Sequence, residues 1–205
     1  MVALLGALRK QMNGAVLDMV RYYGADYGMN YGVAIHSLRD MAAEVGTDDE
    51  FARYLYLQQV RELRIIALWC ADSEALRTQE DMEFWGAGII NSELAEQAAQ
   101  ALLSKAECIE LLLEQWCGGD DSLRVYAALL ASSRAKGVSV EVALRAVEQA
   151  LARFADNRLV AQGAVALVAS HIEKNRPMLG QWLNTLGNTP SARIVREEIE
   201  WRLEY

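Results

Sequence analysis

Helix start and stop signals recur about every fifteen residues along this chain, and little interrupts the segments between them. The chain has only 2 prolines in 205 residues, so few positions prevent a helix from continuing. Alanine, leucine, glutamate and arginine, which are good helix formers, dominate the composition. No segment alternates apolar and polar residues for long enough to predict a β-strand. We therefore predict an all-α fold.

Residues that can cap a helix stand before several of the predicted helices. Asn91, Ser139 and Asn157 are placed to accept a hydrogen bond from the first turn of the following helix. Segments 78–81 and 104–107 both indicate helix starts, and the second contains the Ser and Glu of a capping box. In segment 60–70, the residues Val60, Leu63, Ile66, Ala67 and Cys70 form one apolar helical stripe.

The predicted helices form antiparallel pairs, because the connections between them are short. A spacing of about 30 to 40 residues per pair is typical of helical repeat proteins, which bind partners on their concave side. We therefore predict an α-α superhelix of stacked antiparallel HEAT-like helix pairs in a single domain, 1–205. In this domain, residues 1–47 form N-terminal helices and residues 48–205 form about five pairs. The pairs are 48–57 with 59–71, 77–89 with 91–102, 104–117 with 121–135, 138–154 with 157–174, and 177–186 with 190–204.

The charge of the chain is unevenly distributed. The formal net charge of −8 argues against strong, indiscriminate binding to nucleic acid, which needs many uncompensated lysines and arginines. Residues 72–121 carry 12 acidic and 2 basic side chains, whereas residues 122–196 carry 10 basic and 4 acidic ones. The second segment therefore has the charge to present a basic surface, provided that its cations share one face.

The number and spacing of cysteines and histidines limit which disulfide and metal sites this chain can form. The cysteines Cys70, Cys108 and Cys117 are odd in number, and none has a second cysteine at two-residue spacing, which predicts free thiols in a reducing compartment. We expect a cytoplasmic protein. His36 and His171 lie far apart, so no metal site and no other cofactor are expected. No stretch has the roughly 18 uncharged apolar residues that a membrane span needs, and the opening residues predict a helix and not a signal peptide.

Three motifs within residues 11–97 stand out in their order and spacing. Tyr31-Gly-Val33 precedes an arginine-containing helix, Arg61-Glu-Leu-Arg64 lies within a helix, and Asp81-Met-Glu-Phe-Trp85 lies within another. Together they resemble the DNA alkylation repair family, the AlkD-like alkylpurine DNA glycosylases, which have HEAT-like repeats. The resemblance implies a protein that binds duplex DNA in a concave groove and releases cationic N3- or N7-alkylated purines. Trp116 and Leu123-Arg124 continue it.

The resemblance also implies a catalytic pocket, and this sequence departs from the family there. Segment 91–97 falls in register with the family's Trp-x-x-x-Asp pair, which places Ser92 at the aromatic position and Glu96 at the aspartate position. A second family tryptophan is expected near Gly163, where Ala164 or Val165 stands. The resemblance makes Glu96 the candidate catalytic carboxylate. It makes Ser92, Trp85 and Trp116 the candidate pocket residues.

The chemistry of base release explains why these departures matter. An alkylated purine is cationic, so its glycosidic bond breaks towards a sugar with oxocarbenium character. A carboxylate near that sugar stabilises the charge and can position a water, while aromatic faces contribute cation–π contacts. Glu96 keeps the charge, but its longer side chain moves the carboxylate by about a bond length, which can cost on the order of a hundredfold in rate. Ser92 offers no aromatic face. The pocket is therefore predicted to be altered.

Structural interpretations compete with each functional one. Glu96 fits a solvated or arginine-paired helix residue, and Trp85 and Trp116 fit packing residues. Arg124, Arg134, Lys136 and Arg158 are the candidate DNA contacts, and Arg124 equally fits a salt bridge between repeats.

Two functions remain open on this sequence. One is a DNA alkylation repair-like protein that binds duplex DNA. The other is a non-catalytic HEAT-like repeat module that binds a protein partner or an atypical nucleic-acid structure. A continuous basic stripe on the concave side favours the first, and scattering over the convex face favours the second. The stripe would consist of Arg124, Arg134, Lys136, Arg145, Arg153, Arg158 and Lys174.

Overall fold

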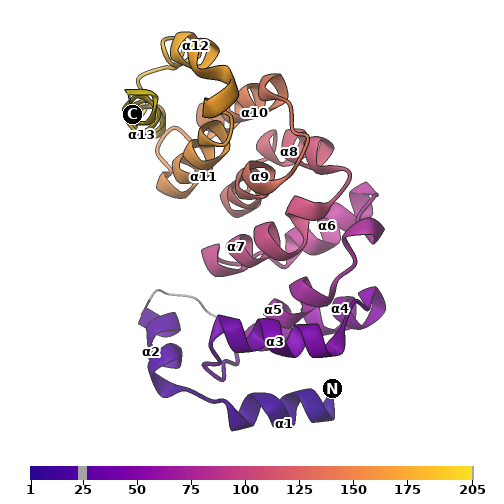
Figure 1. The fold of residues 1–205 in the computed structure, drawn as a ribbon. Coiled ribbons are helices and arrows are strands. Elements are labelled where there is room, and N and C mark those ends of the chain that lie inside the picture. The colour runs from indigo at the N-terminus through magenta and orange to yellow at the C-terminus, as the bar shows by residue number, and fades with distance from the viewer. Residues whose placement is uncertain (23–26, 205) are drawn as a thin grey trace. The chain divides into compact units, whose positions relative to one another are not determined.

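The computed structural model describes residues 1–22 and 27–204, and this part contains thirteen α-helices and two short 3-10 helices. Its extended pairing is limited to one isolated bridge between Met29 and Val60. These observations confirm the all-α fold. The helices gather into two compact units, residues 1–75 and 76–205 (Figure 1). The expectation that residues 1–205 form a single domain stays a prediction. No helix in the described ranges is both long and apolar enough to cross a membrane.

The first unit is organised around one helix that packs against two others. Helix α5 contacts both α3 and α4. In α5, Leu63, Ile66, Ala67 and Cys70 are buried, as the apolar stripe predicted, and Val60 lies at the helix start with part of its surface exposed. The helices of this unit are α1 (Val2–Lys10), α2 (Gly14–Tyr22), α3 (Ile35–Val45), α4 (Asp49–Tyr56) and α5 (Arg61–Cys70), followed by the 3-10 helix η1 (Ser73–Ala75).

Two of the sequence motifs contact each other in the first unit. Glu62 of α5 is fully buried and accepts hydrogen bonds from the backbone N–H groups of Tyr31 at 3.1 Å and Val33 at 3.3 Å. Arg61 donates to the carbonyl oxygen of Val33 at 2.9 Å. Gly32 has φ = 70°, and a Cβ there would collide with the carbonyl oxygen of Asn13, so glycine is required. The motifs Tyr31-Gly-Val33 and Arg61-Glu62 therefore form one structural contact that holds the segment before α3.

The second unit contains a row of parallel helices, each the second member of a helix pair. Contacts run from α7 to α9, from α9 to α11 and from α11 to α13, and we call these four helices the second-helix row. Figure 1 shows them side by side, with α8 and α10 packed on each other behind them. The helices are α6 (Gln79–Ala87), α7 (Ser92–Ala101), α8 (Ile109–Cys117), α9 (Ser122–Arg134), α10 (Val140–Arg153), α11 (Arg158–Ala169), α12 (Ile172–Leu183) and α13 (Pro190–Glu204), with the 3-10 helix η2 (Leu103–Lys105).

The helix start predicted at 104–107 is wrong. Ser104 lies in η2 and its hydroxyl donates to the carbonyl of Gln100, while α8 begins only at Ile109. The reciprocal capping box forms instead at the start of α6. There the Thr78 hydroxyl accepts from the Asp81 N–H at 3.2 Å, and the Asp81 carboxylate accepts from the Thr78 N–H at 3.0 Å. Aspartate therefore fills the role that the sequence pattern assigned to glutamate.

The other predicted caps are confirmed. The side chains of Asn91, Ser139 and Asn157 each accept a backbone N–H from the first turn of α7, α10 and α11 respectively. The helix predicted over 157–174 is shorter, because α11 ends at Ala169. Helix α12 then begins at Ile172 and has non-helical backbone at Asn175, two residues before Pro177. Proline supplies no backbone N–H and crowds the preceding turn, which accounts for this kink.

The cysteines are free thiols, as predicted. Cys70 and Cys117 are buried, and Cys108 is partly buried. Burial, with a smaller contribution from Asp48, raises the pKa of Cys70 to about 11, and burial raises that of Cys117 to about 12. Both thiols are therefore protonated and unreactive at neutral pH. The described residues contain no group of three His, Cys, Asp or Glu side chains placed to hold a metal ion.

Candidate nucleic-acid interface

The candidate catalytic residue Glu96 lies exposed on α7, in the second-helix row. Its carboxylate accepts a hydrogen bond from the Tyr126 hydroxyl of α9 at 3.2 Å. Burial raises the pKa of Tyr126, the charge and hydrogen bond of Glu96 raise it as well, and Arg134 lowers it, which together bring the pKa to about 12. Glu96, Tyr126 and Arg134 therefore form one electrostatic group across α7 and α9.

Tyr126 is held from the other side by α11. A Cβ placed on Gly163 would lie 3.1 Å from Cδ2 of Tyr126 and 3.0 Å from Cβ of Leu129, so the small residue lets α9 and α11 approach closely. Sequence reasoning missed Tyr126, because a single tyrosine in an apolar helix is typical of core packing. Its contact with Glu96 depends on α7 and α9 lying side by side, which the sequence alone does not reveal.

The candidate pocket residues do not gather around Glu96. Ser92, one helical turn before Glu96 and partly exposed, is the one that shares its face. Trp85 and Trp116 are 1% and 3% exposed. Cζ2 of Trp116 lies 3.0 Å from where a Cβ on Gly86 would be, and Trp85 packs edge-on against its neighbour Phe84. Both tryptophans thus lie in the packed interior, with no open face towards a base.

Arg124 is engaged in ion pairs with acidic side chains. Its guanidinium lies 2.7 Å from the Glu83 carboxylate of α6 and 3.6 Å from that of Asp121, the N-cap of α9. This arrangement is the inter-helix salt bridge that the sequence left open as the alternative to a DNA contact. A phosphate would have to displace both carboxylates to reach Arg124.

Two further arginines of the predicted stripe are paired in the same way. Arg145 of α10 lies 2.9 Å from Glu114 of α8, and Arg153 lies 2.6 Å from Asp120 in the connection between α8 and α9. The acidic segment 72–121 therefore supplies the partners of the basic segment that follows it. Three of the seven cations of the predicted stripe are therefore used in ion pairs with acidic side chains.

Three of the other cations of the predicted stripe, Arg134, Lys136 and Lys174, lie at the C-terminal end of the second-helix row, together with Lys105. Lys105 and Arg134 line a hollow of about 420 Å³, Lys174 lines a second hollow of about 530 Å³, and Lys136 lines both. We call Lys105, Arg134, Lys136 and Lys174 the basic edge. Arg134, Lys136 and Lys174 are exposed and have no carboxylate partner in the described part of the chain. One acidic residue lines each hollow: Glu107 the first and Glu173 the second.

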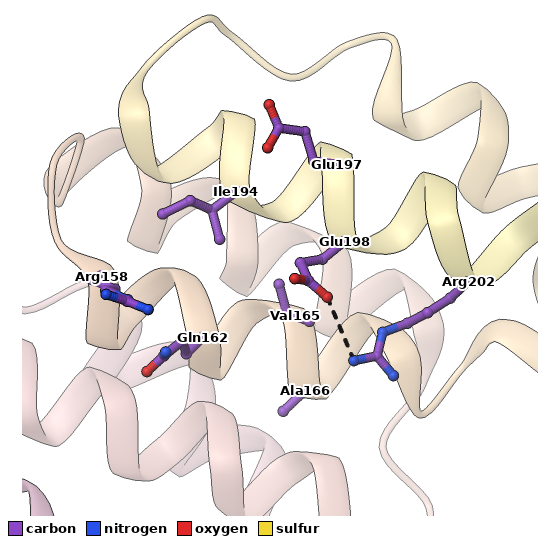
Figure 2. Close-up of a pocket in the computed structure, with 8 residues that line it drawn as sticks. All are labelled: Arg158, Gln162, Val165, Ala166, Ile194, Glu197, Glu198 and Arg202. Atoms are coloured by element: carbon purple, nitrogen blue, oxygen red, sulfur yellow. Dashed lines mark ion pairs between the residues drawn. The ribbon is translucent and has the colours of Figure 1, made fainter.

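Arg158 lies apart from the basic edge, at the opposite end of α11. The 12 residues of α11 span about 18 Å at the helical rise per residue. Figure 2 shows Arg158 at one end of a hollow of about 640 Å³ between α11 and α13, which Glu197 and Glu198 also line. Glu198 lies 3.7 Å from Arg202. These carboxylates make this hollow a less favourable place for phosphate than the basic edge.

The resemblance places a second family tryptophan near Gly163, where Ala164 or Val165 stands. Val165 lines the hollow between α11 and α13, whereas Ala164 is fully buried (Figure 2). Of the two residues that the register allowed for the missing tryptophan, Val165 is thus the one that lines the hollow, and it is still only 8% exposed. The hollow has no aromatic residue among those that line it.

Comparisons with known proteins show the fold. No protein-family model matches the chain, and no curated protein matches it by sequence. A solved structure matches with a TM-score of 0.73 at 12% sequence identity, over 98% of this chain and 94% of that one. It is described as "a new family of proteins related to the HEAT-like repeat DNA glycosylases with affinity for branched DNA structures". The chain therefore has the HEAT-like repeat fold that the sequence predicted.

Proposed function

We propose that this protein binds DNA through the basic edge and prefers branched DNA to plain duplex. The observation that carries the proposal is the gathering of Lys105, Arg134, Lys136 and Lys174 on two adjoining hollows. Three of these cations have no carboxylate partner among the described residues, so their charge is available to phosphate oxygens. By contrast, the paired arginines of α9 and α10 are already neutralised.

The preference for branched DNA follows from the small extent of the basic edge. On a single duplex, four cations at one end of a helix row contact few phosphates. A junction brings the backbones of two arms together, so the same four cations face a higher density of negative charge. The fold likeness supports this choice, because the similar solved protein is described as having affinity for branched DNA.

The acidic character of the chain sets the expected strength of binding. Glu107 and Glu173 lie on the same hollows as the cations, and the whole chain carries a net charge of −8. Binding is therefore weak and salt-sensitive. If all four cations contact phosphates, the logarithm of the binding constant falls with the logarithm of salt concentration with a slope of about −3.6.

Fluorescence anisotropy with a labelled four-way junction and a duplex of the same length, at low salt, tests this proposal. The double variant Arg134→Gln, Lys136→Gln is expected to bind both DNAs more weakly, with a salt slope smaller by about 2. The matched control is Arg145→Gln, Arg153→Gln, which removes the same charge from arginines paired with acidic residues. An equal loss in both variants contradicts the basic edge. No binding by the wild type favours the protein-partner alternative.

Base release by Glu96 is a finer proposal, supported by the exposure of its carboxylate on the second-helix row and by its hydrogen bond with Tyr126. The expected rate is low, because Ser92 has no aromatic face and Trp85 and Trp116 are buried away from Glu96 in the packed interior. The test is release of N7-methylguanine from duplex DNA. If the Glu96→Gln variant no longer releases the base, Glu96 is the catalytic carboxylate. If release is unchanged in this variant, Glu96 is not the catalytic residue. If the wild type releases nothing, the protein binds DNA without excising bases.

A further inference from the structure

The second hollow of the basic edge is lined by a buried serine whose hydroxyl has no hydrogen-bond partner among the described residues. Ser132 of α9 is 2% exposed and lines the cavity of about 530 Å³ at the end of α9 and α11. Its Oγ has no hydrogen-bond partner among the described residues. A buried hydroxyl without an acceptor is costly, so a group of this kind is one that an incoming acceptor would satisfy.

The neighbouring hydroxyls on this cavity differ from Ser132. The Ser133 hydroxyl donates to the carbonyl of Leu130 at 2.8 Å, and the Ser170 hydroxyl donates to the carbonyl of Leu167 at 2.7 Å. Both bonds are made within or next to their own helices and use the single proton of each hydroxyl. Ser132 is therefore the serine on this cavity whose proton is left for a ligand.

The charges around the cavity favour an anion over a neutral acceptor. Lys136 and Lys174 line it, and neither has a carboxylate partner in the described ranges. Val140 brings the first turn of α10 to the cavity, and with it the positive end of a 14-residue helix. Glu173 also lines the cavity, but it is exposed, where solvent and salt weaken its repulsion.

His171 lines the same cavity and reports on its charge. Burial lowers the pKa of His171, Glu141 opposes this effect, and Lys174 adds to it. The imidazole is therefore neutral at pH 7, and the positive charge comes from the two lysines. An anion bound beside His171 would raise its pKa, because it would stabilise the protonated ring.

We infer that this cavity binds a phosphate group, which accepts a hydrogen bond from the Ser132 hydroxyl and pairs with the ammonium groups of Lys136 and Lys174. The inference rests on the proposed function only for the source of the phosphate, which is the DNA backbone. A free phosphate ion has the same chemistry and serves as the probe for the site itself. Proteins commonly bind phosphate with cationic side chains and a hydrogen-bond donor, and this cavity offers both.

The test compares inorganic phosphate binding by the wild type and three variants, measured through the NMR signals of His171 with chloride at matched ionic strength. Ser132→Ala is expected to weaken binding by about tenfold or more, because a hydrogen bond to a charged group is lost. The matched control Ser133→Ala is expected to bind like the wild type. Glu173→Gln is expected to bind several-fold more tightly, because it removes a repulsive charge. The signals of His36, which lies in the other unit, are the internal reference.

Folding does not obscure this comparison. Ser132→Ala removes an unsatisfied buried hydroxyl, so its melting temperature is expected to equal or exceed that of the wild type. If the His171 signals of the wild type do not respond to phosphate, the site is refuted. Equal weakening by Ser132→Ala and Ser133→Ala refutes it as well.

Junction binding by the same variants separates the site from its use. Weaker junction binding by Ser132→Ala than by Ser133→Ala supports both the site and the DNA backbone as its ligand. If Ser132→Ala loses phosphate binding while its junction binding is unchanged, the assignment to DNA is overturned. A wild type that binds phosphate and no DNA overturns the proposed function and leaves the phosphate site standing.

Discussion

Replacing Glu62 with glutamine should release the segment that precedes α3. Glu62 is fully buried, and its carboxylate accepts from the backbone N–H groups of Tyr31 and Val33 and lies 3.1 Å from the Arg61 guanidinium. Arg61 is itself 2% exposed. These three groups are all donors, and the two oxygens of the carboxylate accept from all three.

The size of the effect follows from this geometry. Glutamine has nearly the same shape, but its NH₂ group cannot accept, so at least one of the three donors loses its partner. The buried guanidinium of Arg61 also loses the Glu62 carboxylate, which lies 3.1 Å away, as an ion-pair partner. Removing one member of a buried ion pair costs about 3–5 kcal/mol. Because each 1.4 kcal/mol is a factor of ten, local opening should become about a hundredfold to a few thousandfold more frequent.

Native-state hydrogen exchange measures this opening residue by residue. The amides of Tyr31 and Val33 should lose protection by that factor in Glu62→Gln. The control is Glu50→Gln, an exposed glutamate in the first turn of α4 of the same unit, which should leave both amides unchanged. Unchanged protection of Tyr31 and Val33 in Glu62→Gln would refute the role of the buried carboxylate.

Three further outcomes are expected in the second unit. Gly163→Ala should destabilise it by about 1–3 kcal/mol in urea denaturation, because the new Cβ presses on Tyr126 and Leu129; an unchanged stability would contradict the close approach of α9 and α11. Tyr126 should ionise near pH 12 by ultraviolet absorbance and at lower pH in Glu96→Gln, and an identical titration in the two proteins would exclude the contact. Since the unfolded tyrosine ionises near pH 10, its contribution to stability is complete below pH 10 and is lost as the pH rises towards 12. Thr78→Ala should cost about 1 kcal/mol by removing the capping box of α6, and exchange of the amides in the first turn is the measurement.

Helix boundaries set by local chemistry were predictable from the sequence. Asn91, Ser139 and Asn157 cap helices wherever they stand, because a cap needs only the backbone of the next turn. Ser104 shows the limit of this reasoning. Its spacing to Glu107 matches a capping box, but the chain makes a 3-10 turn there and α8 begins at Ile109. The local pattern alone could not distinguish between these two helix starts.

The candidate site was only partly predictable, because pairing of charges depends on which helices become neighbours. The sequence identified Arg124 and Arg134 as equivalent candidates. In the structure Arg124 lies against Glu83, which is 41 residues away in the chain, while Arg134 lies at an exposed helix end. The two tryptophans likewise match family positions in sequence, and the fold buries both of them.

The sequence by itself determined the all-α class and most of the helix caps, because these depend on residues within about one turn of each other. The short connections also predicted the antiparallel pairing of the helices. The tertiary structure alone decided which cations remain available, since ion pairs such as Arg145 with Glu114 join consecutive repeats. It also decided that Ser132 has a free hydroxyl while the adjacent Ser133 does not. Whether a polar group finds a partner depends on the surfaces that packing brings to it, and that information lies in no single segment of the chain.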